Sequence, residues 1–149
     1  MFGTTVSKDR ADLETQIGRA FIRLEKEYMG RGPLEAKAYL LDDMILVRLK
    51  GVLTPAERKL SESQCDRGVY LVKQVRNELL SSVRPMLEAV VRDITGVQVQ
   101  SVHADISTKT GERIIVITLE HKPNLGDGDR ERPIDRGRIE KMAVREDGE

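Results

Sequence analysis

Few residues in this chain have the chemistry of a catalytic or metal site. The single cysteine, Cys65, lies in the charged segment SESQCDRG, where Arg67 could lower the pKa of its thiol and favour nucleophilic attack. No histidine lies near it in the sequence to act as a base, and His103 and His121 show none of the usual zinc-site spacings. We therefore predict no catalytic residue, no metal and no cofactor, and a protein that is not an enzyme.

The segment Gly30-Arg31-Gly32-Pro33 has two interpretations. It could be an anion-binding loop, with a flexible backbone and the guanidinium of Arg31. It could also simply end a helix, with Gly30 as a left-handed cap and Pro33 preventing further helix. We favour the helix end, because glycine and proline commonly mark such junctions and the spacing of a phosphate loop is missing. The alternative function, an anion or small-ligand sensor, would use Gly30, Arg31, Gly32 and Arg58.

Composition excludes several classes of protein. The 149 residues include 25 basic and 25 acidic side chains, so no overall field favours nucleic acid or an anionic membrane. Three tyrosines, two phenylalanines and no tryptophan are too few for a base-stacking surface. No apolar run approaches the roughly 20 residues of a membrane span, and the N-terminus lacks a secretory signal. With one cysteine and no disulfide framework, we expect a soluble cytoplasmic protein that binds no nucleic acid.

The order of the elements follows from apolar periodicity. From Asp9, apolar residues at three- and four-residue steps predict a helix that ends at Gly30. Residues 37–41 and 44–49 are predicted strands, joined in a tight hairpin at Asp42-Asp43.

The stretch Thr54-Pro55-Ala56-Glu57 carries three signals of a helix start. Threonine is a preferred N-cap, proline suits the first helical position, and glutamate at the third position can complete a capping box. We expect about two helical turns here, followed by a break around residues 63–68.

The longest amphipathic segment runs over residues 69–94 and contains Pro85, which should kink it near Ser81. Two strands are predicted after it. In the first, residues 97–106, the apolar face switches, which indicates a bulge or bend. The second, residues 113–120, is apolar on both faces.

Together these elements predict an α+β fold, a two-layer αββαββ sandwich. Two hairpins would form a four-stranded, mainly antiparallel sheet with both main helices on one face. Because the second and fourth strands are apolar on both faces, we predict that the open sheet face is buried in a homodimer. The predicted interface residues are Met44, Leu46, Ile115 and Ile117.

The predicted domain covers residues 9–121. Residues 1–8 form a flexible lead-in. From Lys122 to the end, residues 122–149 are charged and rich in glycine, so we expect a mobile tail.

Several of these segments resemble the bacterial MpsC-like family of Na⁺-translocating, membrane-potential-generating systems. The resemblance runs over residues 10–121: KEYMGRGP, then AKAYLLDDMILVRLKGVLTPAERKL, then the long helix ending in DITGVQVQSV. It implies a small soluble accessory or regulatory protein of an ion or inorganic-carbon transport system, acting by protein–protein interaction. A subunit of a membrane transport complex is the partner it implies. The family provides no catalytic residue to transfer to this chain.

Overall fold

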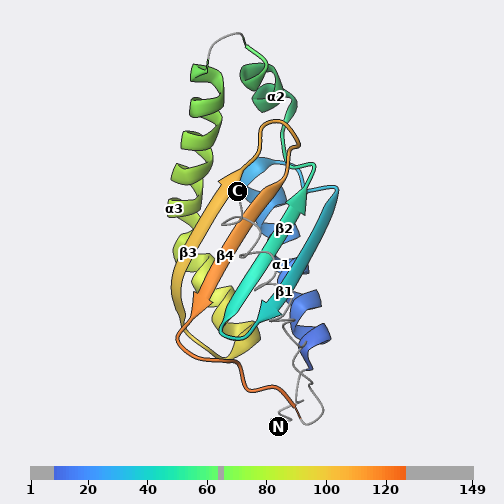
Figure 1. The fold of residues 1–149 in the computed structure, drawn as a ribbon, viewed down its shortest axis with the longest axis vertical. Helices are drawn as coiled ribbons and strands as arrows, with labels where there is room; N and C mark the ends of the chain where they lie inside the picture. Colours follow the sequence, from blue (N-terminus) through green and yellow to red (C-terminus); the bar gives the residue numbers. More distant parts are fainter. Residues whose placement is uncertain (1–8, 64–65, 127–149) are drawn as a thin grey trace, which may run out of the picture.

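The computed structural model describes residues 9–63 and 66–126, which form a helix layer and a sheet layer (Figure 1). The elements in chain order are α1 (Arg10–Met29), β1 (Glu35–Leu41), β2 (Met44–Lys50), α2 (Pro55–Ser61), α3 (Arg67–Thr95), β3 (Val99–Ile106) and β4 (Arg113–Leu119). The predicted α+β sandwich is confirmed. The predicted lead-in, and the predicted tail beyond residue 126, lie outside the described residues.

The two hairpins join through their second strands into one antiparallel sheet, in the order β1-β2-β4-β3 (Figure 1). The register across the middle of the sheet pairs Tyr39 with Leu46, then Leu46 with Val116, and finally Val116 with His103. Strands β2 and β4 therefore form the centre, and β1 and β3 the two edges.

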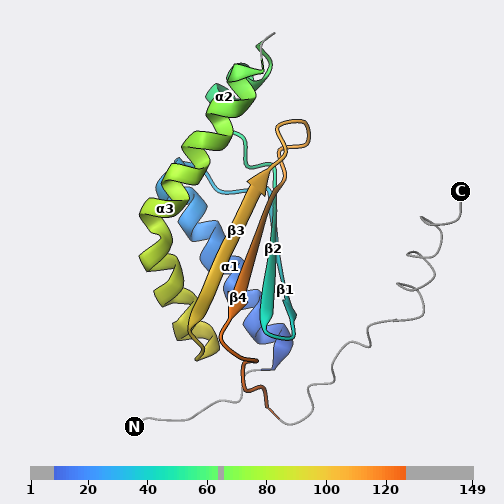
Figure 2. The same ribbon diagram turned by 60° about the vertical axis from the view of Figure 1, so that its left-hand side comes forward.

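Helices α1 and α3 both lie on one face of this sheet, and no described element covers the other face (Figure 2). Alternation along each strand sends one set of side chains toward the helices. The buried apolar core comes mainly from α1 (Leu13, Ile17, Phe21), α3 (Val72, Leu87, Val91) and the sheet (Leu40, Ile45, Val47, Leu49, Ile115, Ile117, Leu119). Each fully buried Leu or Ile contributes roughly 1.5–3 kcal/mol by leaving water.

Local details of the strands agree with the sequence pattern, with small shifts. The predicted bulge in β3 is confirmed by a register shift between Val99 and Ser101. The hairpin turn places Asp42 in the left-handed region at φ 63°, which aspartate tolerates better than most residues. Strand β1 begins at Glu35, two residues before the predicted start, because the Leu34 N–H donates to the Lys50 carbonyl and extends the ladder.

Helix α3 is a continuous α-helix from Arg67 to Thr95, with Pro85 inside it. Proline removes the N–H that would bond to the carbonyl of Ser81. Both residues are exposed, so water can reach this part of the helix. The long helix therefore accommodates the proline on its solvent side, away from the core.

The packing of α2 against α3 depends on Gly68. A Cβ at this position would overlap the backbone carbonyl oxygen of Leu60, which cannot move aside as a flexible side chain would. We expect Gly68→Ala to lower the free energy of unfolding by about 1–3 kcal/mol through overpacking, although alanine is the better helix former. Chemical denaturation measures this.

The matched control is Gly18→Ala in α1, where a Cβ would meet only the Ala36 carbonyl oxygen at 3.9 Å. That substitution should leave stability unchanged or raise it. Equal effects of the two substitutions would contradict the assignment.

Candidate functional site

A cluster of buried charged side chains joins every layer of the domain. Arg76 of α3 is 2% exposed and donates from Nη1 to both Glu25 carboxylate oxygens, at 3.2 and 3.0 Å. It also donates to both oxygens of Glu57 at 2.7 Å, and to the Val52 carbonyl at 2.9 Å. Arg113 of β4 donates to Glu25 at 2.7 Å. Two arginines and two glutamates thus connect α1, α2, α3 and β4 with no net charge.

The capping box at the start of α2 is part of this cluster. As predicted, the Glu57 N–H donates to the Thr54 hydroxyl at 3.2 Å, and the Thr54 N–H donates to Glu57 Oε1 at 2.9 Å. The same Oε1 accepts from Arg76. Helix α2 has no buried residue of its own, and these polar contacts add to its packing against α3 at Gly68.

Burial and hydrogen bonding act in opposite directions on the ionisation of these groups. For Glu57, burial disfavours the carboxylate, but the hydrogen bonds from Arg76 and the Thr54 backbone outweigh it and lower the pKa. For Arg76, burial disfavours the guanidinium, but the bonds to Glu57 and the charge of Glu25 raise its pKa. These interactions favour the charged forms of Glu57 and Arg76.

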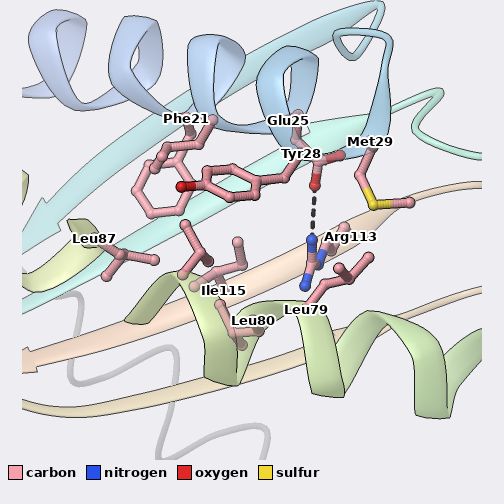
Figure 3. A pocket seen from close by; sticks show the side chains of 11 residues that line it. Phe21, Glu25, Tyr28, Met29, Leu79, Leu80, Leu87, Arg113 and Ile115 are labelled. Atoms are coloured by element: carbon pink, nitrogen blue, oxygen red, sulfur yellow. Dashed lines mark hydrogen bonds and ion pairs between the residues drawn. The ribbon is translucent and has the colours of Figure 1, made fainter. Parts of the chain in front are cut away.

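A small cavity between α1 and α3 lies next to this cluster (Figure 3). It is lined by Phe21, Leu24, Glu25, Tyr28 and Met29 of α1, by Leu79, Leu80, Val83 and Leu87 of α3, and by Arg113 and Ile115 of β4. Its volume of about 30 Å³ is enough for one or two waters, whereas small-molecule sites are typically about 300–1,000 Å³. The Glu25–Arg113 ion pair at its wall is already satisfied. The cavity therefore has the features of a packing gap.

The Gly30–Pro33 loop has the geometry of a helix end. Gly30 is the left-handed C-cap of α1 at φ 82°, and its N–H donates to the Lys26 carbonyl. Arg31 donates to the Leu53 carbonyl at 3.2 Å, which ties the loop to the segment leading into α2. Arg58 is exposed on α2, where its own carbonyl accepts from Ser61. These contacts give Gly30 and Arg31 structural roles, and the ligand-binding role of Gly30, Arg31, Gly32 and Arg58 stays a prediction.

The other reactive side chains do not converge. Cys65 lies outside the described residues. His103 is exposed on β3, with Nε2 3.2 Å from the Ser101 hydroxyl, and His121 is exposed just after β4. Among residues 9–63 and 66–126, no group of three or more His, Cys, Asp or Glu side chains could hold a metal ion.

The uncovered side of the sheet is the other candidate site, and we call it the open face. Its outward-facing residues are Glu35, Lys37, Tyr39, Leu41, Met44, Leu46, Arg48, Lys50, Ser101, His103, Asp105, Ile114, Val116 and Thr118, as follows from strand alternation and register. Tyr39, Met44, Leu46, Ile114 and Val116 are partly exposed there, and Leu41 is 40% exposed. These residues form an apolar patch with charged side chains around it.

The structure corrects two of the four predicted interface residues. Met44 and Leu46 lie on the open face as predicted. Ile115 and Ile117 do not: they are 1% and 0% exposed and pack under the helices. Because β4 is apolar on both faces, alternation alone does not show which face is covered. Their neighbours Ile114 and Val116 are the outward-facing residues.

Sequence reasoning also missed the buried charges. Glu25 follows Phe21 by four residues, and Arg76 follows Val72 by four, so each charge occupies a core position of its helix. Each long helix thus has one charged residue on its apolar face, and this is the sequence signal that could have indicated a buried ion pair.

Comparison with known proteins agrees with the resemblance seen in the sequence. A family model described as "Na⁺-translocating membrane potential-generating system (MpsC)" matches residues 9–121. The chain belongs to the MpsC family. It is similar to "Uncharacterized protein YbcI" of Bacillus subtilis (strain 168), with 40% identity over 114 residues, covering 76% of this chain and 90% of the relative. No solved structure matches significantly. Within the part of this MpsC-family chain that the structure describes, no helix has the length and apolarity of a membrane span.

Removing Arg76 from this MpsC-family domain should destabilise it strongly. Arg76→Met keeps much of the side-chain volume but leaves two buried carboxylates with fewer donors, which typically costs about 3–5 kcal/mol. Urea denaturation followed by circular dichroism measures the loss. The control is Arg84→Met, which removes an exposed pair with Glu88 on the same helix and should change stability by less than about 0.5 kcal/mol. A small effect at Arg76 would contradict the structural role of the cluster.

The lowered pKa of Glu57 predicts a pH-dependent contribution to stability. A carboxyl whose folded pKa lies below its ordinary value of 4.5 stabilises the fold above that value, and the contribution disappears as the pH falls through the folded pKa. Glu57→Gln should therefore lower stability at pH 7 by about 1–3 kcal/mol, and the difference from wild type should shrink below about pH 4.5. Thermal melts across pH test this. Glu62→Gln, exposed at the end of α2, should show no such dependence, and a pH-independent Glu57→Gln effect would refute the assignment.

Proposed function

We propose that this protein is a non-enzymatic accessory or regulatory protein of a bacterial ion or inorganic-carbon transport system that generates membrane potential. It acts in the cytoplasm by protein–protein contact, with a membrane transport subunit as its partner. The description of the MpsC family supports the link to such a system. The surfaces of the domain support the mode of action.

The observation that carries the proposal is the contrast between a satisfied interior and two uncovered apolar surfaces. The four charged groups of the cluster, of which Glu57 is only partly buried, bond to one another, and the cavity beside them is too small for a metabolite. Apolar side chains, by contrast, remain uncovered on both sides of the domain, where another polypeptide can bury them.

The first surface is the open face, and we propose that a second copy of the chain covers it in a homodimer. Met44, Leu46, Ile114 and Val116 supply its apolar centre. The buried pair Ile115 and Ile117 take no part.

The second surface lies on the helix layer and remains outward in such a dimer. Val75, Leu79 and Met86 fall on one side of α3, and the Tyr28 hydroxyl of α1 donates to the sulfur of Met86 at 3.5 Å. We call these four residues the outer stripe. Val75 and Met86 are 50% and 44% exposed. The outer stripe is the proposed contact for the transport subunit.

The alternative function, an anion sensor at Gly30–Pro33, gains no support from the geometry. Its one cation, Arg31, is partly buried and donates to a backbone carbonyl. A thermal-shift screen with anions and nucleotides, in which wild type but not Arg31→Ala is stabilised, would revive it.

Site-specific photo-crosslinking in the native host tests the proposed function. A photoreactive residue in place of Met86 should crosslink to a subunit of a membrane transport complex, identified by mass spectrometry. The matched control is Asn77, exposed on the other flank of α3, which should give no such product. Equal products from the two positions, or none from Met86, would exclude the outer stripe as the contact.

A further inference from the structure

The open face has a charge pattern that is fixed by the strand register. Twelve of its outward-facing residues form three rows across the sheet, and the pair Glu35 and Lys50 lies beyond the first row. The first row reads Lys37, Arg48, Ile114, Asp105; the second Tyr39, Leu46, Val116, His103; the third Leu41, Met44, Thr118, Ser101. Lysine therefore lies at the β1 edge of the first row and aspartate at its β3 edge. The apolar pair Leu46 and Val116 lies at the centre.

Two identical sheets packed face to face can be related by a twofold axis in either of two simple orientations. An axis perpendicular to the strands places each strand over itself and the first row over the third. Lys37 would then face Leu41, so its charge would be buried against an apolar group. Arg48 faces an apolar residue in either orientation, Met44 here and Ile114 in the other, so it does not distinguish the two.

An axis parallel to the strands places β1 of one copy over β3 of the other, and β2 over β4. Each row of one copy then lies over the same row of the other, because a rotation produces no shift along its axis. Lys37 of one copy then faces Asp105 of the other, twice by symmetry. Leu46 faces Val116 at the centre. Facing sheets lie about 10 Å apart with strands within about 30° of each other, a gap that lysine and aspartate side chains can bridge together.

The free domain leaves Asp105 available for this contact. Its carboxylate already accepts from Lys73 of α3 at 3.0 Å, but the side chain remains 74% exposed. Lys37 is 61% exposed, with a 3.6 Å pair to Glu35. Arg48 and Glu112 pair with each other through two hydrogen bonds, so they bring no net charge to the interface.

The area of the open face is that expected for a weak dimer, whose population rises with protein concentration. Four strands about 4.8 Å apart and seven residues of about 3.3 Å give roughly 440 Å² of flat sheet per copy, to which side chains add surface. Typical stable interfaces bury about 800 Å² per partner. Charge pairs at the edges would then favour one arrangement over others.

We propose that two copies of this chain pack open face to open face about a twofold axis parallel to the strands, with Lys37 of each copy paired to Asp105 of the other. This inference rests on the homodimer in the proposed function and adds its arrangement.

Charge reversal tests the arrangement. In size-exclusion chromatography with light scattering over a range of concentrations, Lys37→Asp and Asp105→Lys should each weaken the dimer at least tenfold. The double variant Lys37→Asp/Asp105→Lys should restore most of the affinity. Arg23→Asp, exposed on α1, makes a comparable charge change on the helix layer and should have no effect.

The Asp105→Lys variant could fail to fold, because the new lysine would lie next to Lys73. A crosslinking experiment tests the arrangement without this variant. In a Cys65→Ser background, copies carrying Lys37→Cys are mixed with copies carrying Asp105→Cys and treated with a short bismaleimide. A 37–105 product between copies supports the proposal, whereas Tyr39→Cys, which only the perpendicular axis would place over itself, should not crosslink efficiently to itself.

The outcomes separate the two levels of inference. A wild-type monomer at all concentrations overturns both this arrangement and the homodimer. A wild-type dimer without charge-reversal rescue, or with a dominant 39–39 product, overturns the arrangement alone. Neither result bears on the proposed contact of Met86 with a transport subunit, which the photo-crosslinking experiment tests separately.

Discussion

The domain depends on the guanidinium of Arg76. This one side chain bonds to Glu25 of α1, to Glu57 of α2 and to the Val52 carbonyl, and Arg113 of β4 completes the cluster through Glu25. A buried charge is tolerated only where its partners are all in place, because isolation from water is costly for each ion. The cluster therefore links correct docking of the helices to correct formation of the sheet, and it connects the short helix α2 to the rest of the domain.

In the proposed function, the contacts with other proteins lie at the surface. Charges that bond to one another are not free for a substrate, and the cavity beside them is of water size. The domain has two layers, so one sheet face remains uncovered, while part of α3 stays outside the core (Figure 2). In the proposed function, one surface binds a second copy of the chain and the other binds the transport subunit. This arrangement fits an accessory role in a larger system.

The asymmetry of the open face follows from topology. Lys37 and Asp105 are distant in the sequence, yet the order β1-β2-β4-β3 places them at opposite ends of one row. A row that is basic at one end and acidic at the other complements itself when turned about an axis along the strands. In the proposed dimer, the apolar centre supplies attraction and the charged edges set the orientation.

The sequence by itself determined the elements, their order and the α+β class, because periodicity, caps and turn residues are local signals. Thr54 and Glu57 were predictable as a capping box, and the family match over residues 9–121 follows from sequence as well. Only the tertiary structure decided strand order, and with it that Ile114 and Val116 face outward while Ile115 and Ile117 are buried. It also decided the contacts of Glu25 with Arg76 and Arg113, which are 51 and 88 residues away. When a strand is apolar on both faces, its sequence does not show which face is covered. Ion pairs between residues so far apart in the sequence form only when the helices have packed on the sheet.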